Sequence, residues 1–447
     1  MAIDARSGLD ALQERLRQRY ASPRPRSRAL FARALASLPG GNSRSQLYFA
    51  PFPTYLVSGE GATVVDADGF RYIDLLNNYT SLIHGHSAAM AAGPGVAGTA
   101  FGAPTPLEVE MAAELCARLP SVEKIRFTNS GTEAGIYAIR TARAFTGRTG
   151  VVKAEGGYHG GADWMQVSVK RLGPPGRSVP EFGVTPGTAA ETQVIPFNDV
   201  DGAVRVIRDV GWRCAAVVVE PMQGSAGAIP ADKRYLEALR DVTTEVGSLL
   251  VFDEVMTFRL APGGAQELYG VAPDLTTLGK IIGGGFPLGA FGGRADVMEV
   301  LDPRRDEVLN HAGTFNANPV SLAAGLEAIR RLTPERIAEI NSRGERLRGY
   351  IAERSRQAGV PLSVSGMGSL LQVHVGTEPP RSYREAAARP GLAIGCLFLL
   401  LLLNSVYIAT RGLMSVSTAI QDEHQHDVEV ALGEAVDELR LAGLHAA

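Results

Sequence analysis

Short apolar runs alternate with amphipathic stretches of helical period through the middle of the chain. The runs are rich in Val, Leu and Ile, as in buried strands. The predicted strands span 124–127, 150–153, 192–196, 215–220, 249–252 and 275–278. Helical periodicity covers 133–145, 200–210 and 233–246 in the gaps between them. Strands that alternate with helices predict βαβ units and a mostly parallel, buried sheet in an α/β domain.

The pattern changes on both sides of this region. Apolar positions 9, 12 and 16 share one face of a helix expected over 7–20. Alternating apolar residues around an Asp-Gly turn predict a β-hairpin over 63–75. After about 318 the pattern becomes helical and then mixed, and it closes on an amphipathic helix over 422–441. We therefore expect a large domain at 76–318, with the N-terminal segment 1–75 and the C-terminal part 319–447 forming a smaller α+β domain.

Residues 392–403 are twelve consecutive apolar or small residues without a charge. A helix needs about 20 such residues to span a bilayer. The alternatives are a membrane segment and a helix buried on most sides, and the length favours the buried helix.

Composition and charge exclude several classes of protein. The chain has 447 residues, with 44 Lys and Arg against 47 Asp and Glu, so its net charge is −3. This balance does not fit a nucleic-acid-binding protein, and the arginines of 15–28 are interpreted as a solvated helix face and linker. With 45% hydrophobic and 20% charged residues, the composition is that of a globular enzyme.

Three cysteines, Cys116, Cys214 and Cys396, are too few and too far apart for a disulfide framework or a zinc site. No apolar signal segment occurs in the first 20 residues, so we expect a reducing, cytoplasmic setting. No His or carboxylate set has metal-ligand spacing, and we expect no metal.

A lysine follows the last predicted strand. Strand 275–278 leads into Gly279-Lys280, and three glycines follow at 283–285. This order excludes a P-loop, in which the glycines precede the lysine. A lysine desolvated at a strand end has a lowered pKa and a nucleophilic amine, as a Schiff base requires. The alternative is a surface lysine in a loop.

Two carboxylates, Asp253 and Glu254, end strand 249–252. The carboxyl ends of parallel strands are where α/β sheets bind ligands. A buried Asp there needs a cationic partner, such as the protonated ring nitrogen of pyridoxal phosphate. The alternative is a metal-binding or helix-capping pair.

Ser130, Gly131 and Thr132 lie where strand 124–127 leads into a helix. Backbone N–H groups at a helix N-terminus, together with two hydroxyl groups, form a cradle for phosphate. Ser130 also has capping-box spacing to Glu133, and one geometry serves both roles.

Tyr158 and His159 are surrounded by glycines at 156–161. A planar ring in such a segment can stack on a flat cofactor. The competing interpretation is a flexible surface loop.

In this order, the four motifs resemble the class III (fold type I) pyridoxal-phosphate-dependent aminotransferases. The resemblance covers nearly the whole chain. It implies a large domain with a mostly parallel seven-stranded sheet, a smaller α+β domain, and pyridoxal 5'-phosphate as cofactor. It implies that Lys280 forms the internal aldimine and that Asp253 binds the ring nitrogen. Further cofactor contacts are implied for Val255 and Tyr158 on opposite ring faces, for His159, and for Ser130, Gly131 and Thr132 on the phosphate.

Two more positions match the family. Glu220, at the end of strand 215–220, matches a glutamate near the active site. Thr314, within 311–316, matches a threonine that reaches the phosphate of the neighbouring subunit. The resemblance therefore implies a homodimer with active sites at the subunit interface.

One departure from the usual class III pattern indicates which subgroup the chain resembles. Many class III members have Gln where this chain has Met256, and the surrounding string resembles the subgroup of glutamate-1-semialdehyde aminomutases. Within it, segments 42–45, 48–53, 259–262 and 290–296 are most similar to aminotransferases of β-amino acids, notably β-phenylalanine.

This similarity implies transfer of an amino group from a β-amino acid to an α-oxo acid such as 2-oxoglutarate or pyruvate. Arg44 and Arg411 match positions that bind substrate carboxylates, and Tyr79 is a candidate for packing the donor side chain. Either arginine could instead be a surface ion-pair partner. Two other functions stay open, namely intramolecular amine transfer by an aminomutase and a non-catalytic binding protein that keeps the fold.

Overall fold

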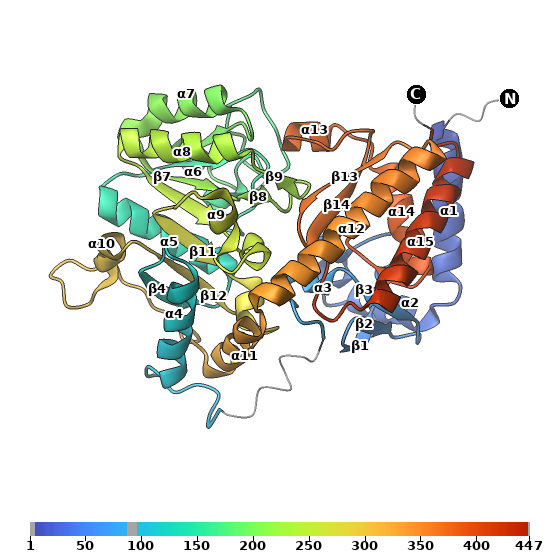
Figure 1. Cartoon of the computed structure of the whole chain (residues 1–447), viewed down its shortest axis with the longest axis horizontal. Coiled ribbons are helices and arrows are strands. Elements are labelled where there is room, and N and C mark those ends of the chain that lie inside the picture. Colours follow the sequence, from blue (N-terminus) through green and yellow to red (C-terminus); the bar gives the residue numbers. More distant parts are fainter. Residues whose placement is uncertain (1–4, 87–95, 446–447) are drawn as a thin grey trace. The chain divides into compact units, whose positions relative to one another are not determined.

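The computed structural model describes residues 5–86 and 96–445, and these form two compact units (Figure 1). The larger unit comprises the described part of Ala89–Ala338 together with Arg381–Ala386. The smaller unit comprises the described parts of Met1–Ala88 and Ala387–Ala447, and Glu339–Pro380. The larger unit thus begins and ends later than the predicted 76–318, and it includes a short segment from far along the chain.

A seven-stranded sheet forms the centre of the larger unit, in the order β4-β12-β11-β10-β7-β5-β6. The strands are β4 (Lys124–Thr128), β5 (Gly150–Ala154), β6 (Thr192–Ile195), β7 (Cys214–Val219), β10 (Leu249–Asp253), β11 (Leu275–Leu278) and β12 (Gly289–Gly293). β12 runs antiparallel to both neighbours, and the pairs within β11-β10-β7-β5-β6 are parallel. The predicted mostly parallel, seven-stranded α/β fold is confirmed.

The apolar pattern predicted six of these strands and did not reveal β12. Its sequence, Gly-Ala-Phe-Gly-Gly, has no β-branched residue and only one large apolar side chain. The glycines are required by packing, because a Cβ at Gly292 would overlap Lys124 O and one at Gly293 would overlap Asp274 O. The neighbouring backbones approach β12 so closely that glycine stands where strands usually have β-branched or aromatic residues.

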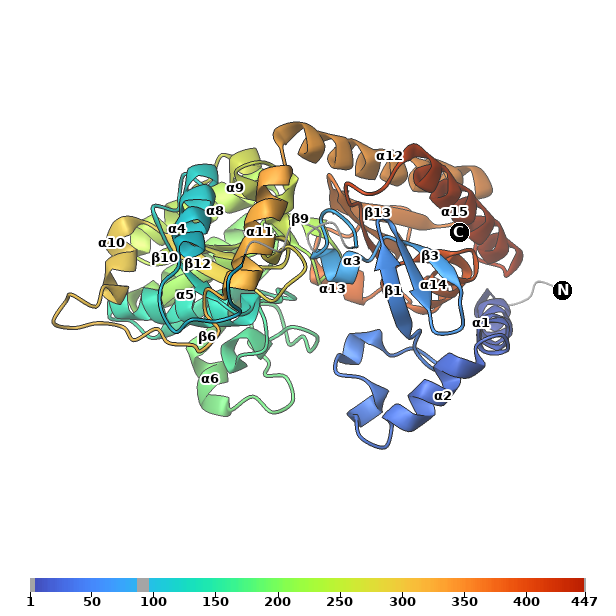
Figure 2. The same ribbon diagram turned by 90° about the horizontal axis from the view of Figure 1, so that it is seen from below.

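Helices cover the sheet, with α5 and α8 on opposite faces (Figure 2). Small residues of α5, including Ala134, Ala138 and Ala142, pack on the strands in a core with Val218 and Val251. The helices of the larger unit are α4 (Pro106–Arg118), α5 (Gly131–Thr146), α6 (Pro186–Glu191), α7 (Val200–Val210), α8 (Lys233–Val246), α9 (Gly264–Tyr269), α10 (Ala295–Met298) and α11 (Pro319–Arg331). A short hairpin joins β8 (Met222–Gln223) to β9 (Ile229–Pro230).

The smaller unit contains two antiparallel-rich sheets. β1 (Leu56–Glu60), β2 (Thr63–Asp66), β3 (Arg71–Asp74) and β15 (Val406–Tyr407) form one. β13 (Leu362–Met367), β14 (Leu370–Val375) and β16 (Leu413–Ser415) form the other. The predicted hairpin is confirmed as β2–β3, and Asp66 Oδ1 closes its turn by accepting the N–H groups of Asp68 and Phe70.

Its helices include α1 (Ala5–Ala21), α2 (Pro25–Ala34), α3 (Asn77–Thr80), α14 (Leu392–Leu403) and α15 (Asp422–Leu441), and most of α12 (Pro334–Ala358). α14 coincides with the apolar segment, packs against α1 and α15, and is buried over most of its length, as predicted. Within 5–86 and 96–445, no helix has the length and apolar character needed to cross a bilayer.

Candidate active site

The predicted lysine and aspartate lie at the same edge of the sheet. Asp253 ends β10 and Lys280 follows β11, its parallel neighbour, in which Thr277 is the register partner of Asp253. Lys280 has a left-handed backbone, with φ of 50°, directly after Gly279. A Cβ at Gly279 would lie 3.3 Å from Val255 Cγ1 and 3.5 Å from Gly131 N. The lysine segment therefore adjoins Val255 and the start of α5.

Asp253 is held by two hydrogen bonds. Its Oδ2 lies 2.7 Å from Nδ1 of His159, and its Oδ1 accepts the N–H of Val255 at 3.1 Å. The His159 ring stacks on Trp164, with centroids 6.1 Å apart. The structure thus places His159 beside Asp253, and the direct contact of the His159 imidazole is with the Asp253 carboxylate. Trp164 escaped the sequence analysis because an isolated Trp gives no signal for what it stacks on.

Glu220 is buried just after β7 and holds the loop that carries Tyr158. Its Oε1 accepts the N–H of Tyr158 at 2.9 Å, and its Oε2 accepts the N–H of Gly224 at 2.9 Å. Burial raises the pKa of the Glu220 carboxyl, nearby Asp253 also raises it, and His159 lowers it. Tyr158 itself, whose N–H group Glu220 holds, is 41% exposed.

The N-terminus of α5 has the predicted cap. Ser130 Oγ accepts the N–H of Glu133 at 3.2 Å, and Glu133 Oε2 accepts the N–H of Asn129 at 2.9 Å. Thr132 Oγ1 accepts the N–H of Gly161 at 3.3 Å, which joins this helix start to the loop of Tyr158. Two hydroxyl groups and the first N–H groups of a 16-residue helix are thereby gathered at one point, where an anion is favoured.

The three predicted substrate-binding residues come together within the smaller unit. The ring of Tyr79 has the Arg44 guanidinium 5.8 Å from its centroid and the Arg411 guanidinium 5.7 Å from it. Arg44 Nη1 donates to Asn78 Oδ1 at 2.9 Å, and among the described residues Arg44 has no carboxylate partner. Arg411 lies more than 300 positions after Arg44 and Tyr79 in the sequence, and the fold places both guanidinium groups beside one aromatic ring.

Tyr79 lies in a strained turn. All four residues of α3, Asn77 to Thr80, have positive φ, from 48° to 75°. L-residues adopt this left-handed conformation at a cost, and it persists where surrounding contacts impose it. One such contact is the hydrogen bond from Asn77 Nδ2 to Ser415 O, at 2.8 Å.

Thr314 is exposed on the segment that follows α10. Nearby, Asn316 Oδ1 accepts a hydrogen bond from Asn129 Nδ2 at 3.0 Å, which anchors the segment beside the start of α5. Asn129 also escaped the sequence analysis, because its partner is 187 residues away.

The residues of the larger unit fit pyridoxal phosphate. A lysine amine, a buried carboxylate and a helix N-terminus match the aldehyde, the ring nitrogen and the phosphate of that molecule. Gly131 supports the match, because a Cβ there would lie 3.0 Å from Val255 Cγ2, so glycine avoids crowding of the valine at the start of α5. Within the described ranges no three His, Cys, Asp or Glu side chains form a group able to hold a metal ion.

Comparison with known proteins agrees with this chemistry. The family model described as aminotransferase class-III matches residues 49–413. A β-phenylalanine transaminase of Variovorax paradoxus is 41% identical over 429 residues, which are 93% of this chain and 94% of that protein. A glutamate-1-semialdehyde 2,1-aminomutase of Methanothermobacter thermautotrophicus is 39% identical over 94% of this chain and 99% of its own length.

Solved structures give the same result. An omega-transaminase from Sphaerobacter thermophilus has a TM-score of 0.90 and 40% identity, covering 94% of this chain and 99% of that one. A β-phenylalanine aminotransferase from Variovorax paradoxus has a TM-score of 0.89 and 40% identity, covering 98% and 100%. The chain therefore belongs to the class III aminotransferases and uses pyridoxal 5'-phosphate as its cofactor.

Proposed function

We propose that the enzyme transfers the amino group of a β-amino acid to an α-oxo acid such as 2-oxoglutarate or pyruvate. The observation that carries the proposal is the pair of guanidinium groups, Arg44 and Arg411, on the ring of Tyr79. A carboxylate lies one carbon farther from the amine in a β-amino acid than in an α-amino acid. Two cations at separate positions let one site accept both kinds of carboxylate. Tyr79 supplies an apolar surface for an aromatic donor. A relative of this chain in Variovorax paradoxus is named as a β-phenylalanine transaminase, which supports a donor of that class.

Residues of this chain would bind the cofactor and move the proton. Pyridoxal phosphate, when bound, supplies an aldehyde for the amino group and a ring that accepts the electron pair of the substrate C–H bond. Lys280 Nζ would accept the proton from the substrate carbon and pass it to a carbon of the bound cofactor. Asp253 keeps the ring nitrogen protonated, and Ser130, Gly131 and Thr132 bind the phosphate.

Four other residues support the site. Val255 and Tyr158 pack on the two faces of the cofactor ring, and His159 and Glu220 hold Asp253 and the Tyr158 loop through the hydrogen bonds described above. Thr314 completes the phosphate site of a second subunit, so the active form is a homodimer. Its exposure in the single chain is consistent with contact to a neighbour.

Arg44→Ala tests the donor assignment. We expect its KM for a β-amino acid to rise about 10–100-fold, because a charge-assisted bidentate contact is lost. Its KM for an amine without a carboxylate should change less than about twofold. Arg71→Ala, which removes another exposed arginine of the smaller unit, is the matched control. Equal KM increases for both donors would show that Arg44 does not bind the donor carboxylate.

Intramolecular amine transfer is the second candidate, since an aminomutase is 39% identical to this chain. An aminomutase needs no acceptor. We expect a β-amino donor to be consumed over many turnovers only when 2-oxoglutarate or pyruvate is present. Turnover of glutamate 1-semialdehyde without any acceptor, and no turnover of β-amino donors with one, would favour the aminomutase.

A further inference from the structure

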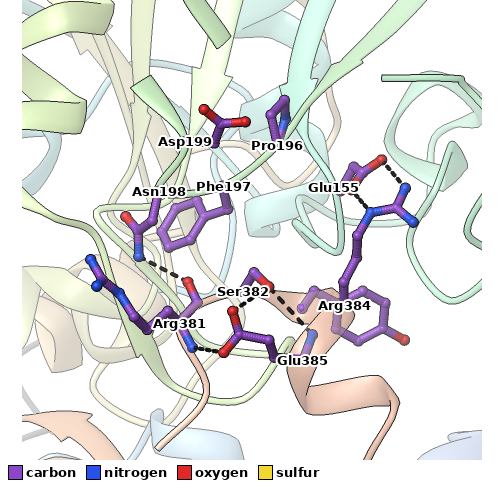
Figure 3. Close-up of a pocket in the computed structure, with 10 residues that line it drawn as sticks. Glu155, Pro196, Phe197, Asn198, Asp199, Arg381, Ser382, Arg384 and Glu385 are labelled. Carbon is purple, nitrogen blue, oxygen red and sulfur yellow. Dashed lines mark hydrogen bonds and ion pairs between the residues drawn. The ribbon is translucent and has the colours of Figure 1, made fainter. Parts of the chain in front are cut away.

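A short segment, Arg381–Ala386, lies against the larger unit although the chain on both sides of it belongs to the smaller one. It includes most of α13 (Tyr383–Ala387). Together with residues that follow β5 and β6, it lines a pocket of about 350 Å³ (Figure 3). Arg381 O accepts a hydrogen bond from Asn198 Nδ2 at 3.0 Å, and Arg381 Nη2 pairs with Asp232 Oδ2 at 2.6 Å. The hydrogen bond to the Arg381 backbone holds the segment at the carboxyl end of the sheet, whereas the Arg381–Asp232 ion pair is exposed.

Arg384, in the same segment, makes a bidentate ion pair with Glu155 (Figure 3). Its Nε donates to Glu155 Oε2 at 2.7 Å and its Nη2 donates to Oε1 at 2.6 Å. Nη2 also donates to the carbonyl of Gly173 at 2.8 Å. Glu155 is only 3% exposed, and its hydrogen bonds raise the pKa of Arg384. A carboxylate buried to this extent requires its cation.

Glu155 begins the loop that leads to Tyr158 and His159. The next residue, Gly156, has φ of 74°, and a Cβ there would overlap the side chain of Tyr383. The segment therefore touches this loop twice, through a charge at Glu155 and through a ring at Gly156. The loop then continues to the N–H of Tyr158, which Glu220 accepts, and to His159, which faces Asp253.

We propose that Arg384 is a positioning residue for the cofactor site, which acts by holding Glu155 and thereby the loop of Tyr158 and His159. Loss of the guanidinium leaves the buried Glu155 carboxylate without its bidentate hydrogen-bond partner. The two glycines after Glu155 give the backbone freedom to turn that carboxylate toward water, and this movement displaces Tyr158 and His159. The inference rests on the proposed function, in which Tyr158 packs on the cofactor ring and His159 holds Asp253.

Arg384→Met tests it through cofactor binding without any substrate. We expect the dissociation constant of pyridoxal phosphate to rise about tenfold, and the visible circular dichroism of the bound cofactor to fall at saturation. Arg381→Met is the matched control, because it removes an exposed ion pair from the same segment, with side chains 71% and 47% exposed. It should change either quantity by less than about twofold.

A rescue separates the charge from general packing. In Arg384→Met with Glu155→Gln no buried charge is left unpaired, so we expect cofactor affinity to recover most of the loss. Arg384→Lys, which keeps the charge, should lie between wild type and Arg384→Met and covers the case in which Arg384→Met fails to fold. Wild-type affinity and dichroism in both Arg384 variants, or no recovery in the double variant, would overturn the inference.

Tyr158→Ala and His159→Gln distinguish failure of the inference about Arg384 from failure of the proposed function. If these two weaken cofactor binding while the Arg384 variants do not, the inference fails and the proposed roles of Tyr158 and His159 stand. If none of the four changes binding, the proposed roles of Tyr158 on the cofactor ring and of His159 on Asp253 fail as well.

Discussion

His311 is a histidine whose hydrogen bond requires the neutral form. Its Nε2 lies 3.1 Å from Asn316 Nδ2, and Asn316 Oδ1 is already used by Asn129. Asn316 therefore donates and the imidazole nitrogen accepts. Burial, together with the nearby guanidinium groups of Arg126 and Arg140, lowers the pKa of His311 to about 4, although the Glu133 carboxylate acts in the opposite direction.

This lowered pKa predicts acid sensitivity of the folded state. The unfolded chain has a His pKa of about 6.5, so between pH 6.5 and 4 it binds more protons than the folded chain. The free energy of unfolding therefore falls as pH drops through this window. We expect the loss in melting temperature from pH 7.5 to 5 to be about 2–4 °C smaller in His311→Gln than in wild type. Equal losses in the two proteins would contradict this origin.

At the scale of the element, the glycine loop after β5 meets the start of α5 at Gly160. Gly160 has φ of 122°, and a Cβ there would overlap Thr132 Oγ1. Gly161, the next residue, has open space at its Cβ position. Of these two adjacent positions, only Gly161 has room for the Cβ atom of another residue.

Gly160→Ala should therefore disturb Thr132 and the N-terminus of α5, since the loop and helix must move apart. We expect about tenfold weaker binding of pyridoxal phosphate and a lower melting temperature. Gly161→Ala is the matched control and should leave the cofactor dissociation constant within about twofold. Similar effects of both substitutions would show that the contact with Thr132 does not decide the result.

At the scale of the whole molecule, the proposed homodimer makes Thr314 act on the neighbouring subunit. Lys280→Ala then impairs the active site of the chain that carries it, whereas Thr314→Ala impairs the active site of the partner chain. In a heterodimer of these variants, one site carries both defects and the other carries none.

Co-expression of the two variants with different affinity tags, followed by double purification, tests this arrangement. We expect the heterodimer to recover about half of wild-type activity per dimer, while each homodimer stays impaired. If Thr314 served its own subunit, each site of the heterodimer would carry one defect and no recovery would occur. A monomer in light scattering would also contradict the proposal.

Local pattern was sufficient to predict much of this protein. The parallel strands have continuous apolar runs because both faces of the sheet are buried, and α14 is apolar on all sides because it is buried on most of them. The cap at Ser130 and the lysine after β11 depend on residues adjacent in sequence. These features follow from interactions within a few residues, and a linear pattern records them.

The tertiary structure decided what depends on distant partners. β12 is a strand because it pairs with β11 and β4 on its two sides, and its glycines are needed because neighbouring backbones leave no room for Cβ atoms. His159 reaches Asp253 across 94 positions, and Arg384 reaches Glu155 across 229. The ring of Tyr79 gathers two arginines from opposite ends of the chain. Such contacts form only when folding brings separate segments to one place, so no pattern within a segment contains them.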